Sequence, residues 1–184
     1  DKSGNGYNAP IVGGAAVASV TTGKGATNLT SALSGTSSQG VNFPVGILPS
    51  TYTLFHVTRW QNNPDQRIFQ ASGTNWLSGH WGNYTAQAYH NGWLTGQSNP
   101  YGDNWFISTD QNSLYRSNGI TRGSSGAGSP SYGRLCINGN GQYPGEFSAW
   151  CCAEVIVYNT TLSSTNYGNV ESYLASRYGI TLGV

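Results

Sequence analysis

Hydrophobic and polar positions alternate most regularly near the end of the chain, from residue 147 to residue 158. A period of two residues is typical of a β-strand, and here both sets of alternate positions carry large or apolar side chains. One face would hold Phe147, Ala149, Cys151, Ala153, Val155 and Val157, and the other Trp150, Cys152, Glu154, Ile156 and Tyr158. We therefore predict a long strand that is covered on both faces.

The period changes to that of a helix immediately afterwards. Ser163 and Ser164 are candidate N-caps, and Gly179 suits a left-handed C-cap. Between these caps the apolar positions recur at helical spacing, at Val170, Tyr173, Leu174 and Tyr178. The chain is therefore expected to end in one amphipathic helix.

Earlier in the chain the alternation is shorter and is broken by turn residues. It is clearest at residues 52–60, and further strand candidates follow at residues 67–71, 75–80, 86–94, 104–109, 112–117 and 134–137. Residues 1–40, rich in Gly, Ser, Thr and Ala, indicate loops with short edge strands near 11–12 and 15–20. Residues 119–133 indicate a flexible loop. Many short strands separated by turns predict an all-β sandwich.

Two segments resemble a known family. The strand A-E-V-I-V-Y-N and the helix V-E-x-Y-L-A-x-x-Y-G-I, within residues 153–180, resemble the C-terminal end of laminin G-like domains of the concanavalin A-like lectin/glucanase superfamily. The opening DKSGNGYNA resembles a turn that follows the first strand in that family. The resemblance implies a two-sheet antiparallel jelly-roll sandwich with one C-terminal α-helix, used mostly for glycan or protein recognition and sometimes for glycan cleavage.

Length and composition agree with one such domain. The 184 residues suffice for one sandwich, residues 1–184, and are too few for two comfortable domains. Only 8% of the residues are charged and 26 are Gly, which favours strands and turns over helical bundles. The chain contains no Met, so we expect a processed product or a segment of a longer protein that lacks its first strand, which the resemblance places upstream of Asp1.

The charge pattern excludes some partners. The net charge is +1, from eight basic and seven acidic residues without a basic cluster, which makes nucleic acid and anionic lipid poor partners. No apolar run approaches the roughly 20 residues of a membrane span, so we expect no membrane insertion. Sequons at Asn28, Asn83 and Asn159 suggest an extracellular protein or one on a cell or particle surface.

The three cysteines leave two alternatives open. Cys136 could form a disulfide with Cys151 or Cys152 if their strands are neighbours. Alternatively, all three are small buried apolar side chains.

Candidate chemistry gathers between residues 74 and 94. Sugars stack their apolar face on aromatic rings, while amides and imidazoles bond their hydroxyls. The predicted glycan-binding residues are Trp76, His80, Trp81, Asn83, Tyr84, His90 and Trp93. The alternative for each tryptophan is that it fills the space between the two sheets.

Metal ligands are sparse. His80 and His90 flank a predicted hairpin and could approach each other, but two imidazoles without a third ligand make a weak site. Asp103 and Asp110, with Asn residues nearby, are weak calcium candidates, and turn-capping is their alternative role. We expect no cofactor other than calcium, and His56 is expected to be structural.

Enzyme motifs are also sparse. The acidic strand motif E-x-D-x-x-E of related glucanases is absent, and Glu154 is expected to be structural, paired with Arg134 or Arg177. A lyase centre built from His56, Arg59 and a Tyr stays open. Three hypotheses result: a non-catalytic, extracellular carbohydrate-binding module; a structural sandwich in a larger assembly such as a filament, cell-wall layer or virion surface; and a polysaccharide lyase or glycosidase.

Overall fold

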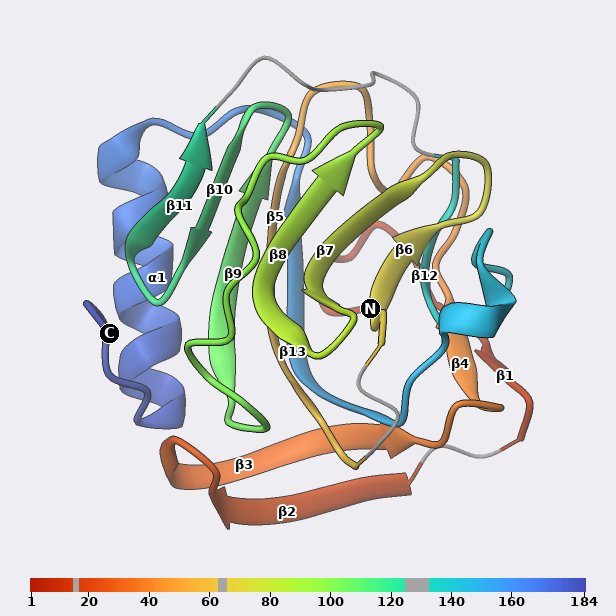
Figure 1. Ribbon diagram of the computed structural model, residues 1–184, viewed down its shortest axis with the longest axis horizontal. Coiled ribbons are helices and arrows are strands. Elements are labelled where there is room, and N and C mark those ends of the chain that lie inside the picture. The colour runs from red at the N-terminus through yellow and green to blue at the C-terminus, as the bar shows by residue number, and fades with distance from the viewer. Residues whose placement is uncertain (15–16, 63–65, 125–132) are drawn as a thin grey trace.

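The computed structural model describes residues 1–14, 17–62, 66–124 and 133–184, and it has the predicted sandwich architecture (Figure 1). The six-stranded sheet has the order β1 (Ile11–Val12), β4 (Gly40–Asn42), β12 (Leu135–Ile137), β6 (Phe69–Ala71), β7 (Trp76–Trp81), β8 (Tyr84–His90). The seven-stranded sheet has the order β11 (Ile120–Ser124), β10 (Leu114–Ser117), β9 (Phe106–Gln111), β5 (Thr53–Trp60), β13 (Trp150–Tyr158), β3 (Ala26–Gly35), β2 (Val17–Gly23). Neighbouring strands of both sheets are antiparallel.

Most of the strand predictions are confirmed, and three segments differ. Residues 26–35, expected to be a loop, form β3, and residues 40–42, for which no strand was predicted, form β4. Residues 120–124 of the predicted flexible loop form β11. The remainder of that loop, residues 125–132, lies outside the described residues. The small and polar side chains of β3 carry little hydrophobic alternation, so its strand conformation comes from pairing with β2 and β13.

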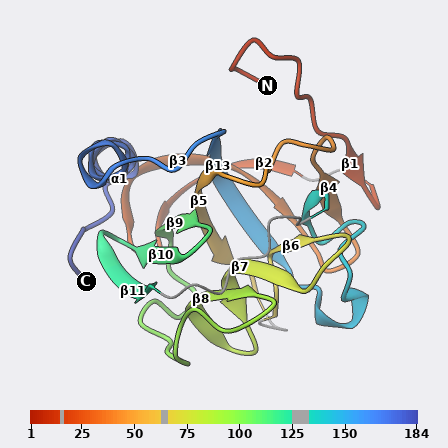
Figure 2. The same cartoon turned by 90° about the horizontal axis from the view of Figure 1, so that it is seen from above.

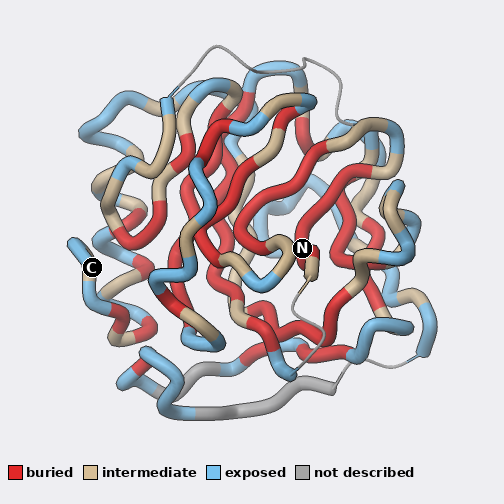
Figure 3. The backbone as a smooth tube through the Cα atoms, in the orientation of Figure 1, coloured by how far each residue is buried: buried red, intermediate tan, exposed pale blue. Residues whose placement is uncertain are grey.

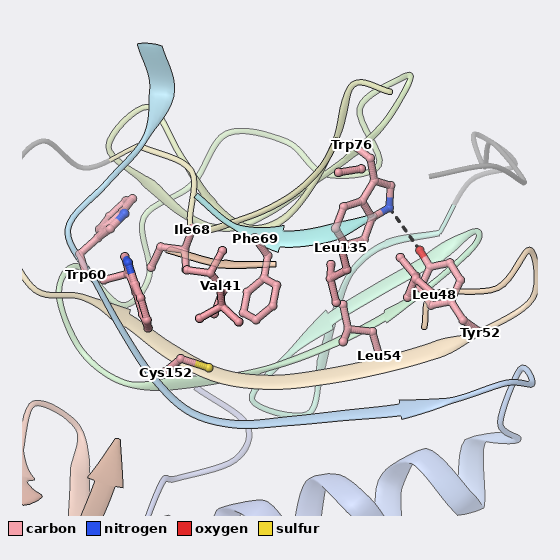
Figure 4. Close-up of a cluster of buried hydrophobic side chains, with 13 residues drawn as sticks. Val41, Leu48, Tyr52, Leu54, Trp60, Ile68, Phe69, Trp76, Leu135 and Cys152 are labelled. Carbon is pink, nitrogen blue, oxygen red and sulfur yellow. Dashed lines mark hydrogen bonds between the residues drawn. The ribbon is translucent and has the colours of Figure 1, made fainter. Parts of the chain in front are cut away.

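Buried residues follow the strands of both sheets (Figure 3). Between the sheets, large side chains of both form the core (Figure 4). Figure 4 shows Trp60, Phe69, Trp76 and Leu54 among the residues that meet there. All four are at most 1% exposed. Burial of such side chains stabilises the fold by roughly 1.5–3 kcal/mol each.

The helix α1 (Ser164–Tyr178) covers the other face of the seven-stranded sheet (Figure 2). Its predicted caps are confirmed, because Ser163 accepts a hydrogen bond from the backbone N–H of Asn166 and Gly179 is left-handed with φ 63°. Tyr173, expected on the apolar face, is instead 51% exposed. Glu171 takes a buried position and bonds Arg116 through both carboxylate oxygens, at 2.9 and 3.0 Å. Among the described residues no helix is long and apolar enough to cross a membrane.

The predicted faces of β13 hold only as far as Cys152. A β-bulge lies between Cys152 and Glu154 in the pairing with β5, and it adds one residue to β13. Beyond it, Val155 and Val157 pack against the same inter-sheet core as Trp150 and Cys152. The alternation over residues 147–158 is therefore wrong beyond the bulge.

The three cysteines are free and buried. Cys136 lies in the six-stranded sheet and the other two in the seven-stranded sheet, so their strands are not neighbours and the disulfide alternative is wrong. Cys152 faces the inter-sheet core, whereas Cys151 belongs to the cluster under α1. Burial raises the pKa of Cys136 to about 11.

Candidate functional site

The β7–β8 hairpin carries the predicted site residues on two opposite faces. The hairpin turns at Gly82 and Asn83, with φ of 57° and 70°, as a two-residue loop requires. The register pairs Trp76 with His90 and Trp81 with Tyr84. Directly paired residues share a face of the sheet. Trp76 and His90 both face the core, whereas Trp81 and Tyr84 both face outward. A bulge at Gly79 and His80 lies between the two pairs.

The inner face holds a buried polar network. Trp76 donates its indole N–H to the Tyr52 hydroxyl at 3.3 Å (Figure 4). Tyr52 in turn donates to Asp110 at 2.8 Å. His90 Nε2 lies 3.1 Å from the Asp110 carboxylate, and His90 Nδ1 lies 3.1 Å from the Asn112 carbonyl. Trp76, His90 and Asp110 are each at most 1% exposed, so this network is closed to a ligand.

The environment of His90 favours its protonated form. Burial lowers its pKa, but the charge and hydrogen bond of Asp110 and the Asn112 carbonyl outweigh burial and raise the net pKa above the ordinary 6.5. Both ring nitrogens face acceptors, which an imidazolium satisfies by donating twice. When protonated, His90 can donate to both Asp110 and the Asn112 carbonyl in the interior.

His80 has the opposite environment. It is fully buried, its ring centroid lies 4.8 Å from those of Trp60 and Phe106, and neither ring nitrogen has a hydrogen-bond partner among the described residues. Burial, and then the nearby His56, hold its pKa well below 6.5. His80 pairs with Thr85 in the register, not with His90, so the expected approach of the two imidazoles is wrong.

The outer face of the hairpin presents an aromatic cluster, which we define as Trp81, Tyr89 and Trp93. Trp93 is 42% exposed, and its ring centroid lies 5.0 Å from those of Trp81 and Tyr89. The backbone holds it there, because Tyr89 and Trp93 form a β-bridge and the Leu94 N–H donates to the Ala88 carbonyl at 3.0 Å. Trp93 is thus held rigidly while much of its ring faces solvent.

A carboxylate fixes the orientation of Trp81. The indole N–H donates to Glu146 Oε2 at 2.9 Å, and the same oxygen accepts from Arg67 Nε at 2.5 Å. Arg67 also donates to Asn75 Oδ1 at 2.9 Å, and its guanidinium lies 4.3 Å from the centre of the Tyr143 ring. Glu146 Oε1 has no hydrogen-bond partner among the described residues, and the side chain is 33% exposed. A carboxylate oxygen next to the aromatic cluster is therefore open to an incoming hydroxyl.

The predicted site residues therefore fall into two groups, one buried and one at the surface. Trp76, His80 and His90 are buried, whereas Trp81, Asn83, Tyr84 and Trp93 reach the surface. Tyr89, Glu146 and Arg67 were not among the predicted site residues. Glu146 lies 65 residues from Trp81 along the chain, so no local motif could associate the two residues.

The remaining candidate residues serve other contacts. The calcium candidates do not meet, because Asp103 is exposed and pairs with Lys24 whereas Asp110 is buried with His90. Among the described residues no group of three or more His, Cys, Asp and Glu side chains is placed to hold a metal. His56 is structural, as expected: it is fully buried and bonded to Thr58 and Ser78.

The acidic side chains do not form a hydrolase pair in the described part of the chain. Glu154 bonds the Tyr178 hydroxyl at 2.6 Å and pairs with Arg177 at 3.3 Å, which confirms a structural role with one of the expected partners. Glu171 is bound to Arg116 under the helix. No second described carboxylate shares the contacts of Glu146, and a glycosidase needs two facing carboxyl groups.

The sequons differ in their surroundings. Asn83 and Asn159 are exposed, in the hairpin turn and after β13. The Asn28 side-chain amide donates to the carbonyls of Ser176 and Arg177, at 2.8 and 3.3 Å, and so caps the end of α1. A glycan on Asn28 would compete with this cap.

No protein-family model and no curated protein matches the sequence. Solved structures match it at low identity. Domain 4 of an extracellular arabinanase from Geobacillus stearothermophilus, in complex with arabinotriose, has a TM-score of 0.61 at 15% identity, over 92% of this chain and 91% of that one. The binding domain of Paraclostridial Mosquitocidal Protein 1 has a TM-score of 0.62 at 12% identity, over 94% of this chain and 49% of that one.

The sialidase of Trypanosoma rangeli, in complex with the inhibitor DANA, matches with a TM-score of 0.56 at 13% identity. The match covers 88% of this chain but only 32% of the sialidase. At these identities the likeness establishes the fold alone, a β-sandwich shared with binding domains and with parts of glycan-processing enzymes. The laminin G-like resemblance stays a prediction.

Proposed function

We propose that the protein is a non-catalytic carbohydrate-binding module, and that a sugar binds at the aromatic cluster of Trp81, Tyr89 and Trp93. The observation that carries this proposal is the exposure of Trp93, which is 42% exposed although its ring packs against both neighbours. An aromatic ring held in place loses little conformational entropy when a ligand stacks on it. The cluster therefore offers a preorganised apolar platform.

The polar neighbours complete the proposed site. The apolar face of a pyranose or furanose would stack on Trp93, while its hydroxyls would donate to the unpartnered Oε1 of Glu146. Hydrogen bonds to a charged acceptor are roughly twice as strong as neutral ones. Because Arg67 already pairs with the other carboxylate oxygen, the site favours a neutral sugar over one that needs a free cation.

Two further observations support the proposal. Domain 4 of the arabinanase has the same fold over nearly its whole length, and its structure was solved with a bound oligosaccharide. The net charge of +1 also suits an uncharged ligand better than a polyanion. By analogy, an extracellular or surface location and glycan or glycoprotein partners belong to the same proposal.

The test is a glycan array that includes arabino-oligosaccharides and sialylated glycans, followed by titration calorimetry on any hit. We expect Trp93→Ala to weaken binding at least tenfold, which corresponds to about 1.4 kcal/mol. Glu146→Gln keeps an acceptor without the charge and is expected to have a smaller effect. The matched control is Tyr173→Ala, which removes an exposed aromatic side chain from α1.

Each variant is checked by near-UV circular dichroism, so that loss of binding is separated from loss of fold. A folded protein that binds no glycan on the array would contradict the proposal. Equal affinity of the wild type and Trp93→Ala would show that any binding occurs elsewhere.

A further inference from the structure

A second aromatic ring is joined to the aromatic cluster through Glu146 and Arg67. It belongs to Tyr143, which directly precedes the 3₁₀ helix η1 (Pro144–Glu146). The Tyr143 side chain is partly exposed, and its ring lies over the guanidinium of Arg67, which is itself only 4% exposed. Because this buried cation covers one face of the ring, the exposed part of Tyr143 is its opposite face or its rim.

The backbone around Tyr143 is held in place. The Tyr143 N–H donates to Gln70 Oε1 at 3.3 Å, and the Tyr143 carbonyl accepts from the Glu146 N–H at 3.0 Å. The Arg67 N–H donates to the Glu146 carbonyl at 2.9 Å, and Arg67 forms a β-bridge with Phe147. The Tyr143 ring is therefore preorganised for stacking, which limits the conformational entropy that is lost when a ligand binds.

Arg67 also fixes the orientation of two polar side chains. A guanidinium only donates hydrogen bonds, so each of its partners turns an oxygen towards it. Arg67 Nε donates to Glu146 Oε2, and Arg67 Nη1 donates to Asn75 Oδ1 at 2.9 Å. The remaining polar atoms of the two partners are an acceptor, Glu146 Oε1, and a donor, the amide nitrogen of Asn75. Neither atom has a hydrogen-bond partner among the described residues, and both side chains are partly exposed.

This donor and this acceptor suit the hydroxyl groups of a sugar. Each hydroxyl can both donate and accept a hydrogen bond, so it can bind either group. A few polar groups that are fixed beside an apolar platform orient a bound ligand and give it specificity. Asn75 and Tyr143 therefore provide the same combination of polar group and aromatic ring as Glu146 and the aromatic cluster.

The two aromatic platforms are separate. Among the described residues, the Trp81 ring contacts the ring of Trp93 and not that of Tyr143. The ion pair of Arg67 and Glu146 connects Trp81 to Tyr143, because Glu146 accepts from Trp81 and Arg67 lies under Tyr143. A single sugar ring that is stacked on the aromatic cluster therefore does not cover Tyr143.

We propose that Tyr143 and Asn75 form a second subsite, so that the ligand is a neutral oligosaccharide of at least two units. This inference rests on the proposed carbohydrate-binding function. One unit stacks on the aromatic cluster, and a neighbouring unit stacks on Tyr143 and accepts a hydrogen bond from the Asn75 amide. Glu146 accepts from a hydroxyl of the first unit. Arg67 touches neither unit and is a positioning residue for Glu146, Asn75 and Tyr143.

The test compares sugars of different length by titration calorimetry. The probes are arabinotriose, xylotriose, cellotriose, mannotriose and galactotriose, each beside its monosaccharide. At least one trisaccharide is expected to bind at least tenfold more tightly than its monosaccharide. A trisaccharide that uses only one subsite gains about threefold, because any of its units can occupy that subsite.

The variants assign the gain to the second subsite. Tyr143→Ala is expected to weaken binding of that trisaccharide at least fivefold and to leave the monosaccharide unchanged. Tyr143→Phe keeps the ring and is expected to bind both sugars as the wild type does. Trp93→Ala, in the aromatic cluster, is expected to weaken both. Near-UV circular dichroism checks that each variant is folded.

Asn75→Asp tests the polar half of the subsite. The aspartate keeps an oxygen towards Arg67 but has an oxygen in place of the donating amide nitrogen. It is expected to weaken the trisaccharide at least threefold and to leave the monosaccharide unchanged. Asn169→Asp, an exposed position on α1, makes the same change of charge and is expected to have no effect.

Arg67→Lys tests the positioning role, because a lysine keeps the charge but lacks the planar fork that bonds Glu146 and Asn75 together. It is expected to lower the ratio of trisaccharide to monosaccharide affinity, whereas a loss of fold would abolish the binding of both sugars.

Three results would overturn the second subsite and leave the proposed function standing. The first is a trisaccharide gain of about threefold or less, and the second is a Tyr143→Ala variant that weakens both sugars equally. The third is unchanged trisaccharide binding in both Tyr143→Ala and Asn75→Asp. A folded wild type that binds none of the probes would overturn both proposals.

Discussion

The two faces of the β7–β8 hairpin use the same residue types in opposite ways. On the inner face Trp76 is fully buried, and its indole N–H bonds Tyr52. On the outer side Trp93 packs against Trp81 and Tyr89 and is still 42% exposed. The inner residues are therefore expected to determine stability and the outer residues recognition.

The difference shows why aromatic content alone does not locate a site. Trp76 and Trp93 both lie in the aromatic stretch around residues 74–94, but Trp76 lies in β7 and is buried, whereas Trp93 follows β8 and forms a bridge with Tyr89. A tryptophan contributes to binding where its ring is held by neighbours yet left open to solvent, as the aromatic cluster holds Trp93. Five substitutions in three comparisons test the contrast between buried and exposed residues, from the largest expected effect on stability to the smallest.

Trp76→Ala is expected to lower the free energy of unfolding by about 3–5 kcal/mol, because it leaves a cavity between the sheets. Trp93→Ala is the matched control from the outer face and is expected to lower it by about 1 kcal/mol or less. Urea titration followed by circular dichroism measures both. Equal losses in the two variants would contradict the assignment of the faces.

Asp110→Asn is expected to lower the free energy of unfolding by about 3 kcal/mol, because it leaves the buried His90 without its counter-charge. Asp103→Asn breaks the exposed pair with Lys24 and is expected to change stability by less than 1 kcal/mol. The same urea titration compares them. If Asp110→Asn proves as mild as Asp103→Asn, the buried pair does not hold the two sheets together.

His80→Leu is expected to stabilise the protein by about 1 kcal/mol at pH 7, since it removes two buried ring nitrogens that have no partner. It should also reduce acid sensitivity. Burial lowers the pKa of His56 to about 3 and that of His80 well below 6.5. The unfolded chain therefore binds more protons than the folded one, and stability falls as the pH drops below 6.5.

His90 acts in the opposite direction, because its folded-state pKa is raised and its contribution is lost as the pH rises through that value. Its contribution is the same in both proteins, so it cancels when His80→Leu is compared with the wild type. Thermal melts between pH 4.5 and 8 provide the comparison. A wild type and a variant with parallel pH profiles would show that His80 carries none of the acid sensitivity.

Much of the fold was predictable because its signals are local. Ser163 and Gly179 mark the ends of α1 by their own backbone and side-chain preferences, and the long alternation marked β13. The strand β3 was missed because its side chains are small and polar, and only pairing with its neighbours makes it a strand. The bulge in β13 was missed because the segment from Cys152 to Glu154 contains no Gly or other residue type that indicates an extra residue in the strand.

The candidate site was predictable only as a region. The aromatic stretch was visible, but the choice between Trp76 and Trp93 depended on the strand register, which pairs Trp76 with His90, and on the bridge between Tyr89 and Trp93. The carboxylate that orients Trp81 comes from the 3₁₀ helix η1 (Pro144–Glu146), which is distant in sequence. Contacts of this range depend on how the strands are ordered in the sheet.

The amino-acid sequence by itself determined the sandwich class, the terminal helix with its caps and the aromatic composition of the hairpin, because periodicity, capping and turn chemistry act over a few residues. Only the tertiary structure decided which tryptophan is exposed, that Glu154 pairs with Arg177, and that the edge of β13 beyond Cys152 lacks a second strand. These outcomes depend on strand register and on the contacts that β3 makes with both β13 and α1, which form only when distant segments pack together.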